Sequence, residues 1–368
     1  MSDSYIFISP SKYIQGADAV FELGAHVKPL GGSALVVGGA SGLAATREGR
    51  ERSFSEHGIR QFEAPFGGES SDAEIDRLAE LARANSCDVI IASGGGKAID
   101  SAKAAAAKLE LPCAIVPTVA SSDSPCSSLS VIYNEDGTFN RVQPFKRNPD
   151  VVLVDTAIIA RAPVRQLVSG MGDALATWYE ADACRRAGSR NVSGGSATLA
   201  ALALARLCRD TLFDNGYGAI VACYSNVVTP ALDRVVEANT LLSGLGFESA
   251  GVAVAHALSE GLSAVPEMHG YTHGEKVAFG LLVQLILEGR PSGEFDEVLL
   301  FCQSVGLPTT LRELGVEDIG KSAAALMRAA IIASEPGRPS QGLSFPVTGR
   351  ALFDAMIAAD TFGREARD

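Results

Sequence analysis

Residues 92–100 of the chain form the segment Ala92-Ser93-Gly94-Gly95-Gly96-Lys97-Ala98-Ile99-Asp100. This glycine-rich segment continues the apolar run Val89–Ala92 and opens an alanine-rich helical pattern over Lys97–Leu109. A short apolar run bounded by glycines is typical of a buried parallel strand. Glycines in the following turn let backbone amides approach an anion at the helix N-terminus. The segment predicts a strand-turn-helix unit that could hold a phosphate, although a tight turn without a ligand fits the same residues.

Two common nucleotide motifs do not fit this turn. A P-loop requires glycine five residues before the Gly-Lys pair and serine or threonine after it, but Ile91 and Ala98 occupy those positions. The Rossmann pattern G-x-G-x-x-G is also absent here. Asp100 could simply be a first-turn carboxylate that favours the helix dipole. A G-x-S-x-G nucleophile elbow is missing as well, which argues against a serine hydrolase.

Strand and helix patterns alternate on both sides of this segment. Asn134-Glu135-Asp136-Gly137 also separates two apolar runs, Leu129–Tyr133 and Phe139–Val142, and predicts a hairpin. The alternation predicts an α/β domain with a doubly wound, mostly parallel sheet. The predicted strands are Tyr5–Ile8, Ala34–Val37, Ile59–Ala64, Val89–Ala92, Ala114–Val116 and Val151–Val154, with helices at Ala17–Val27, Ala44–His57, Ala73–Ala84 and Lys97–Leu109.

The pattern changes beyond Pro163, where helical spacing rich in alanine and leucine dominates to the end of the chain. We therefore expect an α/β domain over residues 1–160 and an all-α domain over residues 161–368. The clearest helical runs of the second domain are Asp173–Arg186, Ser196–Leu212, Pro230–Leu242, Val252–Val265, Glu275–Leu287 and Gly320–Ala333.

The charge and cysteine content limit the possible partners. The 368 residues include 43 acidic and 31 basic side chains, and a net charge of −12 disfavours nucleic acid and anionic membranes. No apolar run reaches the roughly 18 residues of a spanning helix, and Met1-Ser2-Asp3-Ser4 lacks the basic start of a secretory signal. Seven scattered cysteines without a CxxC pair are typical of a reducing compartment. We expect a cytoplasmic protein with no nucleic-acid or membrane partner.

A hydroxyl-rich loop follows the next predicted strand. Because ligands bind beyond the carboxyl ends of parallel strands, this loop is a second candidate for ligand binding, although polar turns are also common without one. Cys126 has no recognisable histidine partner, so we expect a buried structural thiol there. The loop reads Pro117-Thr118-Val119-Ala120-Ser121-Ser122-Asp123-Ser124-Pro125-Cys126-Ser127.

Three of the five histidines, His256, His269 and His273, lie close together in the second half. His256 lies within a helical run, His273 directly precedes the next one, and Asp173 could contribute a carboxylate from a third helix. Two imidazoles and one carboxylate with an open position suit a catalytic divalent metal, most plausibly zinc. The competing interpretations are ordinary core or surface histidines, and Asp173 as a helix N-cap. His269 fits either a surface turn or a residue that supports the ligands.

Several ordered blocks spread over nearly the whole chain resemble the iron-containing, or group III, alcohol dehydrogenase family, and within it the members that oxidise glycerol. These blocks are Gly94-Gly95-Gly96-Lys97-Ala98-Ile99-Asp100-Ser101-Ala102-Lys103, Pro117-Thr118 with Asp123-Ser124-Pro125, Asn148-Pro149-Asp150, Gly172-Asp173-Ala174-Leu175-Ala176-Thr177, Leu241-Leu242-Ser243-Gly244-Leu245-Gly246-Phe247-Glu248-Ser249, and His273-Gly274-Glu275-Lys276-Val277-Ala278.

The resemblance implies a dehydroquinate synthase-like architecture, with the active site in a cleft between a dinucleotide-binding domain (1–160) and a helical metal-binding and substrate domain (161–368). It implies metal ligation by Asp173, His256 and His273, and a polyol contact at Asp123. The cofactor-binding residues that it implies are Gly39, Gly95, Gly96, Lys97, Ala98, Ile99, Asp100, Thr118, Val119, Ala120, Ser121, Ser127, Leu129 and Tyr133.

Two positions refine this expectation. The iron-dependent relatives resemble one another in a histidine four residues after the ligand aspartate, and this chain has Thr177 there, so three protein ligands and zinc are expected. Gly39 stands where NAD-using relatives tend to carry an aspartate for the adenosine ribose. Without that carboxylate NADP becomes possible, while NAD is the first expectation.

The resemblance implies zinc-dependent, reversible oxidation of glycerol or a related vicinal diol to a hydroxyketone such as dihydroxyacetone, with hydride transfer to NAD. It also suggests a homo-oligomer, with an octamer as the assembly that the resemblance implies. The alternatives are a dehydrogenase of another small alcohol or a 2-hydroxy acid that uses NADP, for which Lys276 is the nearby cation, and a lyase of the dehydroquinate synthase type. Such a lyase needs a basic cluster for a phosphorylated substrate, and none lies beside the ligand segments. A metal-binding protein without catalysis is a third alternative.

Overall fold

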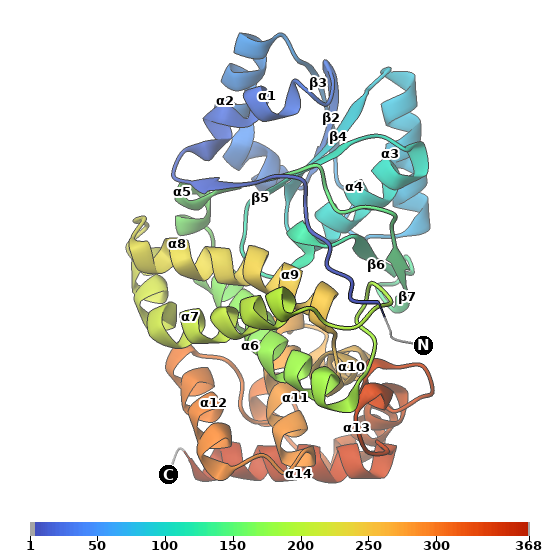
Figure 1. Cartoon of the computed structure of the whole chain (residues 1–368), viewed down its shortest axis with the longest axis vertical. Coiled ribbons are helices and arrows are strands. Elements are labelled where there is room, and N and C mark those ends of the chain that lie inside the picture. Colours follow the sequence, from blue (N-terminus) through green and yellow to red (C-terminus); the bar gives the residue numbers. More distant parts are fainter. Residues whose placement is uncertain (1–3, 367–368) are drawn as a thin grey trace. The chain divides into compact units, whose positions relative to one another are not determined.

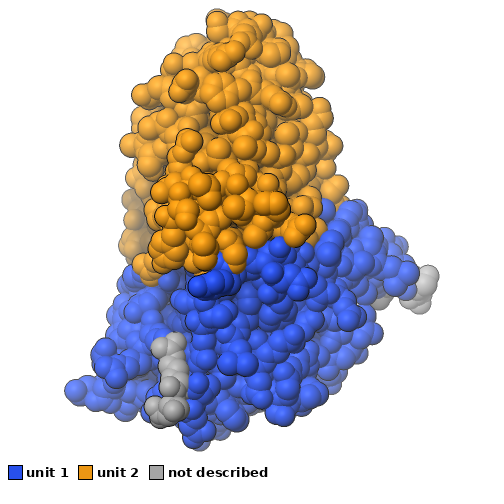
Figure 2. Space-filling model, turned by 90° about the vertical axis from the view of Figure 1, so that its left-hand side faces the viewer, with its two compact units in different colours: residues 1–7, 168–217, 245–368 blue, residues 8–167, 218–244 orange. Residues whose placement is uncertain are grey.

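The computed structural model describes residues 4–366, so most of the N-terminal segment Met1–Ser4 lies outside the described residues. The chain forms two compact units, coloured separately in Figure 2. The α/β unit comprises residues 8–167 and 218–244, and the helical unit comprises residues 1–7, 168–217 and 245–368. These units differ from the ranges 1–160 and 161–368 because short segments exchange between them. The functional role assigned to each domain stays a prediction.

The α/β unit is built on a six-stranded sheet in which every neighbouring pair is parallel. Helices cover both faces of this sheet (Figure 1), which confirms the predicted α/β fold. The strand order is β1 (Tyr13–Gly16), β8 (Val151–Asp155), β5 (Cys113–Pro117), β4 (Val89–Gly94), β2 (Ser33–Gly38) and β3 (Arg60–Pro65). The accompanying helices are α1 (Leu23–Val27), α2 (Ala40–His57), α3 (Asp72–Ala84), α4 (Gly96–Leu109) and α5 (Thr156–Ala160).

The order in which successive strands are added to the sheet reverses between β2 and β4. From β2 the chain proceeds to β3 at one edge, and the later strands β4, β5 and β8 follow on the other side of β2. The carboxyl ends of neighbouring strands at such a reversal leave a crevice for a ligand in open α/β sheets. A Cβ atom at Gly38 would lie 2.1 Å from the carbonyl oxygen of Ser93, so glycine is needed where the two turns meet. The fold therefore brings the turns after β2 and β4 to one edge.

The first strand differs from the prediction. The predicted strand Tyr5–Ile8 is wrong, because Tyr5 makes a single bridge to Ser196 and is 73 % exposed. The edge strand is β1, whose residues are all half-buried and carry no continuous apolar run. The predicted helix Ala17–Val27 is a 3₁₀ turn, Ala19–Glu22, followed by the short helix α1.

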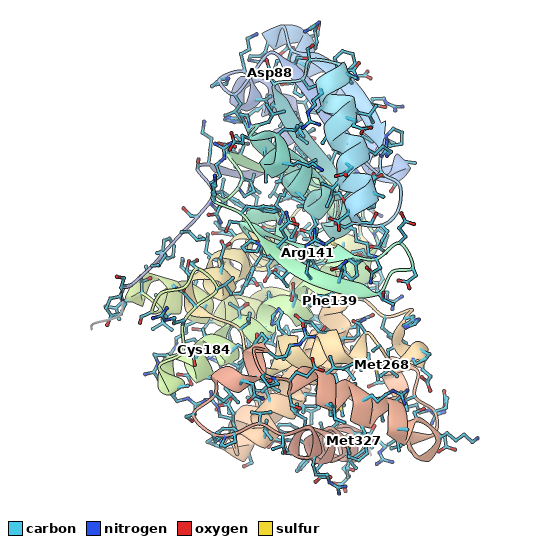
Figure 3. The ribbon with its side chains drawn as sticks, turned by 90° about the vertical axis from the view of Figure 1, so that its right-hand side faces the viewer. Asp88, Phe139, Arg141, Cys184, Met268 and Met327 are labelled. Carbon is cyan, nitrogen blue, oxygen red and sulfur yellow. The ribbon has the colours of Figure 1, made fainter. Side chains whose placement is uncertain are left out.

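The predicted hairpin is confirmed as the antiparallel pair β6 (Leu129–Tyr133) and β7 (Phe139–Pro144). Its residues Phe139 and Arg141 are labelled in Figure 3, and Arg141 forms an ion pair with Asp72 at the start of α3. The α/β unit also contains α8 (Pro230–Glu237) and a π-helical turn, Ala238–Leu242, where the sequence predicted one continuous helix.

Helices dominate the C-terminal part, as predicted. They are α6 (Val164–Ala187), α7 (Leu199–Tyr224), α9 (Ser243–Ala250), α10 (Val254–Leu262), α11 (His273–Leu287), α12 (Ser292–Val305), α13 (Ile319–Ala333) and α14 (Gly349–Glu365). Within residues 4–366 no single helix has the length and apolar content needed to cross a membrane. Among these residues, one pair of helices, Pro230–Ala250 and Val254–Leu262, has that length and apolar content in combination, but it is bent by 105°.

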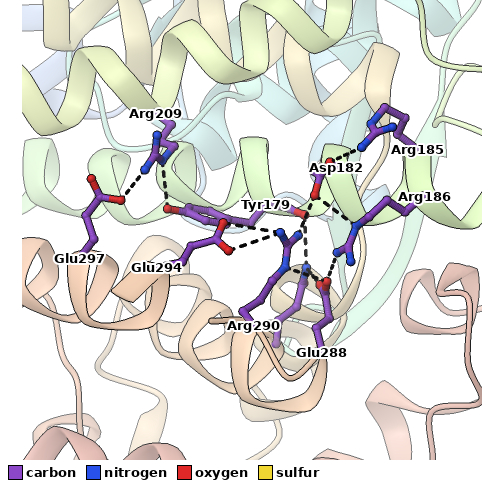
Figure 4. A network of polar contacts seen from close by, with 10 residues as sticks. Tyr179, Asp182, Arg185, Arg186, Arg209, Glu288, Arg290, Glu294 and Glu297 are labelled. Carbon is purple, nitrogen blue, oxygen red and sulfur yellow. Dashed lines mark hydrogen bonds and ion pairs between the residues drawn. The ribbon is translucent and has the colours of Figure 1, made fainter. Parts of the chain in front are cut away.

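An ion-pair network ties α6 to the end of α11 and the start of α12 (Figure 4). The Arg290 guanidinium lies 2.8 Å from Asp182, 3.1 Å from Glu288 and 3.4 Å from Glu294. Burial alone would raise the pKa of Asp182, but hydrogen bonds from Arg185 and Arg290 outweigh it and hold this pKa below its usual value. The side chains of Arg290, Asp182 and Glu288 are at most 12 % exposed, so the removal of Arg290 leaves two shielded carboxylates without this partner.

We expect Arg290→Ala to lower the free energy of unfolding by about 3–5 kcal/mol at neutral pH. Because folding lowers the pKa of Asp182, its ionised carboxylate stabilises the folded protein fully at pH values above the ordinary aspartate pKa of about 4. This stabilisation is lost as the pH falls through the pKa that Asp182 has in the folded protein. The difference between the variant and the unchanged protein should therefore shrink below about pH 4. Urea unfolding at several pH values measures this difference in the free energy of unfolding. The control is Arg185→Ala: the Arg185 side chain is half-exposed and pairs with Asp182, so its removal should lower the free energy of unfolding by at most about 1 kcal/mol.

Candidate functional site

Asp173, His256 and His273 converge within the helical unit, one from each of α6, α10 and α11. Asp173 Oδ1 lies 3.2 Å from Nε2 of His256 and 3.2 Å from Nε2 of His273. The two imidazole rings are 5.5 Å apart between centroids and tilted by 54°. The candidate ligand atoms, one carboxylate oxygen and one nitrogen from each imidazole, all lie within 4.8 Å of one another. The sequence prediction that these residues lie together is confirmed, while their role as metal ligands stays a prediction.

Asp173 lies in the interior of α6 and is fully buried, so the alternative that it is a helix N-cap is wrong. Two glycines let α6 and α11 approach closely beside it. A Cβ atom at Gly172 would lie 2.4 Å from the carbonyl oxygen of Gly274, and one at Gly274 would lie 1.7 Å from the carbonyl oxygen of Ser169. Because each glycine neighbours a candidate ligand in sequence, this close crossing sets the distance between Asp173 and His273.

A capping box fixes the start of α11. Thr272 is the N-cap, its hydroxyl accepts from the backbone of Glu275, and the Glu275 carboxylate accepts from the Thr272 amide at 2.7 Å. The helix therefore begins at His273, two residues before the predicted start at Glu275, and holds that imidazole in its first turn. The sequence Thr272-His273-Gly274-Glu275 carries the capping-box signal, so this part of the site was readable in advance.

The electrostatics of the cluster favour an ionised carboxylate. Burial alone would raise the pKa of Asp173, but His273 and His256 outweigh it and hold this pKa well below its usual value. Burial would likewise lower the pKa of His256, but Glu180 and Asp173 together raise it well above the usual histidine value. Glu180 is a fully buried residue of α6 that the sequence reasoning missed.

The donor set suits a divalent cation. One carboxylate oxygen and two imidazole nitrogens are the ligands of catalytic zinc sites, which keep a further position open. The His273 side chain is 47 % exposed, while Asp173 is almost fully covered, so the cluster is open on one side. Thr177 lies one turn after Asp173 and is buried, and a Cβ atom at Gly246 would come within 2.6 Å of its methyl group. A threonine packed in this way adds no fourth nitrogen ligand.

The other candidates near the cluster have different surroundings. His269 is exposed, follows a short 3₁₀ turn and is not part of the convergent group. Lys276, the cation considered for a 2-hydroxy acid, is buried and donates to the Ser263 hydroxyl at 2.8 Å. The seven cysteines are free and buried, and burial raises the pKa of Cys113 to about 12, which is typical of inert structural thiols.

The predicted cofactor residues gather in the α/β unit at the carboxyl edge of the sheet. Gly39 follows β2, Gly95 and Gly96 follow β4, and Thr118 follows β5. A Cβ atom at Gly95 would lie 3.3 Å from the Val119 side chain, so the glycine turn lies against the loop after β5. Gly95 is the N-cap of α4 and offers no side-chain cap, which leaves the first amides of this helix without a side-chain partner at its N-cap. This is the arrangement that binds a pyrophosphate in related architectures.

The remaining positions of the loop after β5 lie at the same edge or support it. Ala120 is buried, and its carbonyl oxygen accepts from the Asn239 side chain in the π-helical turn. Ser121 follows it in the loop. Ala98 and Ile99 are buried in the first turn of α4, where they contribute packing.

The Asp100 carboxylate makes its polar contacts with other residues of the protein. Its carboxylate accepts from the Ser124 hydroxyl at 2.7 Å and from the Val131 amide at 3.1 Å, and it pairs with the buried Lys103. Lys103 in turn donates to the Ser127 hydroxyl and to the Leu129 carbonyl oxygen. Asp100 therefore holds the segment that carries the predicted cofactor residues Ser127 and Leu129.

Lys97 and Tyr133 meet at the start of α4. The Lys97 ammonium lies 5.0 Å from the centre of the Tyr133 ring and forms an ion pair with Glu69 at 2.6 Å. Asp123, the predicted polyol contact, is buried in the α/β unit and accepts from the Ser243 hydroxyl at 2.9 Å. The roles of all these residues toward cofactor and substrate stay predictions.

Comparison with known proteins gives consistent matches over the whole chain. Residues 10–156 match the model of a family described as iron-containing alcohol dehydrogenase. The chain is 49 % identical to glycerol dehydrogenase from Escherichia coli O6:H1 over 98 % of this chain and 97 % of that protein. It is 48 % identical to glycerol dehydrogenase from Pseudomonas putida, with 97 % of both covered. The crystal structure of glycerol dehydrogenase from Schizosaccharomyces pombe superposes with a TM-score of 0.95 at 39 % identity, over 99 % of this chain and 92 % of that one.

Proposed function

Because the chain belongs to the iron-containing alcohol dehydrogenase family, we propose that it is an NAD-dependent glycerol dehydrogenase. It oxidises glycerol or a related vicinal diol reversibly to a hydroxyketone such as dihydroxyacetone. The observation that carries the proposal is the convergence of Asp173, His256 and His273 in a chain so similar to glycerol dehydrogenases. The family supports a nicotinamide cofactor and a metal ion.

We assign zinc to the cluster because its ligands are one carboxylate and two imidazoles, with Thr177 in place of a fourth nitrogen ligand. A divalent ion held there would polarise the substrate hydroxyl and lower its pKa. The protein's own contribution is the fixed placement of the ligands, with Asp173 kept ionised and buried. Asp123 would accept hydrogen bonds from a second or third substrate hydroxyl, and the turns after β2, β4 and β5 would hold the cofactor whose nicotinamide C4 receives the hydride.

The proposal is tested with zinc-loaded protein and a panel of glycerol, other vicinal diols and 2-hydroxy acids, each with NAD and with NADP. Net formation of NADH with glycerol, and its consumption with dihydroxyacetone, are the expected results. A lyase of the dehydroquinate synthase type would restore its NAD within each turnover and accumulate no NADH. No net NADH formation with any alcohol would refute the dehydrogenase assignment.

The nucleotide preference is tested at Gly39, the N-cap of α2, where a Cβ atom would meet no heavy atom within 4 Å. We expect Gly39→Asp to raise the ratio of kcat/KM with NAD to kcat/KM with NADP by about 10-fold or more, because a carboxylate repels the 2′-phosphate and can bind the ribose hydroxyls. Gly39→Asn is the neutral control of nearly equal size. An unchanged ratio in Gly39→Asp would remove Gly39 from the cofactor site.

We also propose a homo-oligomer in a reducing cytoplasm. Tyr217, Val221 and Tyr224 form an exposed apolar stripe on one face of α7, which fits an interface between copies of the chain. The free, buried cysteines fit a reducing compartment. Light scattering coupled to gel filtration measures the assembly, and a monomer at micromolar concentration would contradict the first part.

A further inference from the structure

The helix that carries His256, α10, has no side-chain hydrogen bond from its N-cap residue. Ala253 precedes α10 and provides no side-chain cap. Instead, Glu180 Oε1 accepts from the backbone amides of Ala253 at 2.8 Å and His256 at 3.0 Å. Gln284 Oε1 accepts from the amides of Val254 and Ala255, both at 3.0 Å. The amides at the start of α10 are therefore satisfied by α6 and α11, the two helices that carry Asp173 and His273.

The same elements also hold the two imidazole rings. Glu180 Oε2 lies 2.5 Å from Nδ1 of His256, and the Ser259 hydroxyl of α10 lies 3.3 Å from Nδ1 of His273. Glu180, Ser259 and Gln284 are fully buried. An ionised carboxylate only accepts hydrogen bonds, so its partner Nδ1 of His256 must carry the hydrogen. In the neutral ring, which is the form that binds a cation, this leaves the lone pair on Nε2, the atom beside Asp173.

We propose that Glu180 is a positioning residue of the metal centre, which fixes the Nδ1–H tautomer and the ring orientation of His256 and, together with Gln284, the position of α10. The inference rests on the proposed metal site. Each ligand helix supplies one ligand and one buried side chain that holds another ligand helix. Glu180 follows Asp173 by two turns of α6, Ser259 follows His256 by one turn, and Gln284 follows His273 by three turns. A carboxylate behind a metal-bound imidazole also increases its basicity as a ligand.

The sharpest test is Glu180→Gln, which keeps the shape and can still accept from the two backbone amides. Its NH₂ group would face Nδ1 of His256 and favour the tautomer with hydrogen on Nε2, which cannot bind a cation. We expect about 10- to 100-fold weaker zinc affinity in competition with a chelator. The control is Asp182→Asn on the same helix, because the Asp182 carboxylate forms ion pairs with Arg185, Arg186 and Arg290. It should lower stability and leave zinc affinity within about 2-fold.

A second readout is independent of whether Glu180→Gln folds. In the zinc-loaded, unchanged protein labelled with ¹⁵N-histidine, His256 should show a slowly exchanging Nδ1–H proton and metal-bound Nε2, with His256→Ala to assign the signal. Metal on Nδ1 of His256, or zinc affinity of Glu180→Gln equal to that of the unchanged protein, would overturn the inference. If the unchanged protein binds no zinc, or binds it equally well after Asp173→Asn, the proposed metal site itself fails and this inference with it.

Discussion

Asp173→Asn should remove zinc from the protein and lower kcat/KM with glycerol by about 10³-fold or more, since a metal ion supplies several kcal/mol of transition-state stabilisation and each 1.4 kcal/mol is tenfold in rate. The substitution keeps the shape of the side chain but removes the charge that lies 3.2 Å from both imidazoles. An amide oxygen is a weaker zinc ligand than a carboxylate, and the Asn NH₂ group would face a nitrogen donor.

The measurements are zinc content after gel filtration, turnover and circular dichroism. Asp210→Asn on α7 removes the same charge from a half-exposed side chain outside the cluster and should retain zinc and activity. Unfolding of Asp173→Asn would show up in the dichroism spectrum, and in that case His273→Ala, at a half-exposed side chain, gives the same test. Turnover that persists in a variant free of metal would disprove the role of the cluster.

Gly274→Ala should be the most destabilising single-methyl substitution that the site region offers. The added Cβ would lie 1.7 Å from the carbonyl oxygen of Ser169, and Gly172, one turn further along α6, packs against the same turn of α11. Because backbone atoms block the methyl group, α6 and α11 must separate, and we expect a loss of about 3 kcal/mol or more. The separation would also move His273 away from Asp173 and weaken zinc binding.

Chemical denaturation and the zinc competition assay measure both effects. Gly293→Ala on α12 is the matched control, since a Cβ atom there meets no heavy atom within 4 Å. It should be neutral or stabilising by up to about 1 kcal/mol, because alanine favours a helix over glycine. Equal stability of Gly274→Ala and Gly293→Ala would mean that the two helices are not held at this crossing.

The sequence predicted the candidate ligands because histidine is rare in this chain and helical spacing placed Asp173, His256 and His273 on separate helices. It did not reveal Glu180 or Gln284. Both are common residue types, and their importance comes from contacts with α10 that span 76 and 30 positions of the chain. No local pattern marks such a partner.

The same distinction explains the fold. Buried strands such as β4 are continuous apolar runs and were predicted closely, while β1 is a half-buried edge strand defined by its pairing with β8. The helical segment 218–244 has the periodicity of its neighbours, so the sequence could not show that it belongs to the α/β unit. The structure shows that this segment belongs to the α/β unit because the Asn239 side chain donates hydrogen bonds to the Ala120 and Leu167 carbonyl oxygens.

The way the two units divide the chain has a consequence for its synthesis. The ribosome releases the six strands of the sheet well before residues 218–244, which complete the α/β unit. Until then the Ala120 and Leu167 carbonyl oxygens lack the Asn239 side chain. The loop after β5 therefore gains these hydrogen bonds only when a later part of the polypeptide has been synthesised, and a premature stop codon between residues 168 and 217 would remove them.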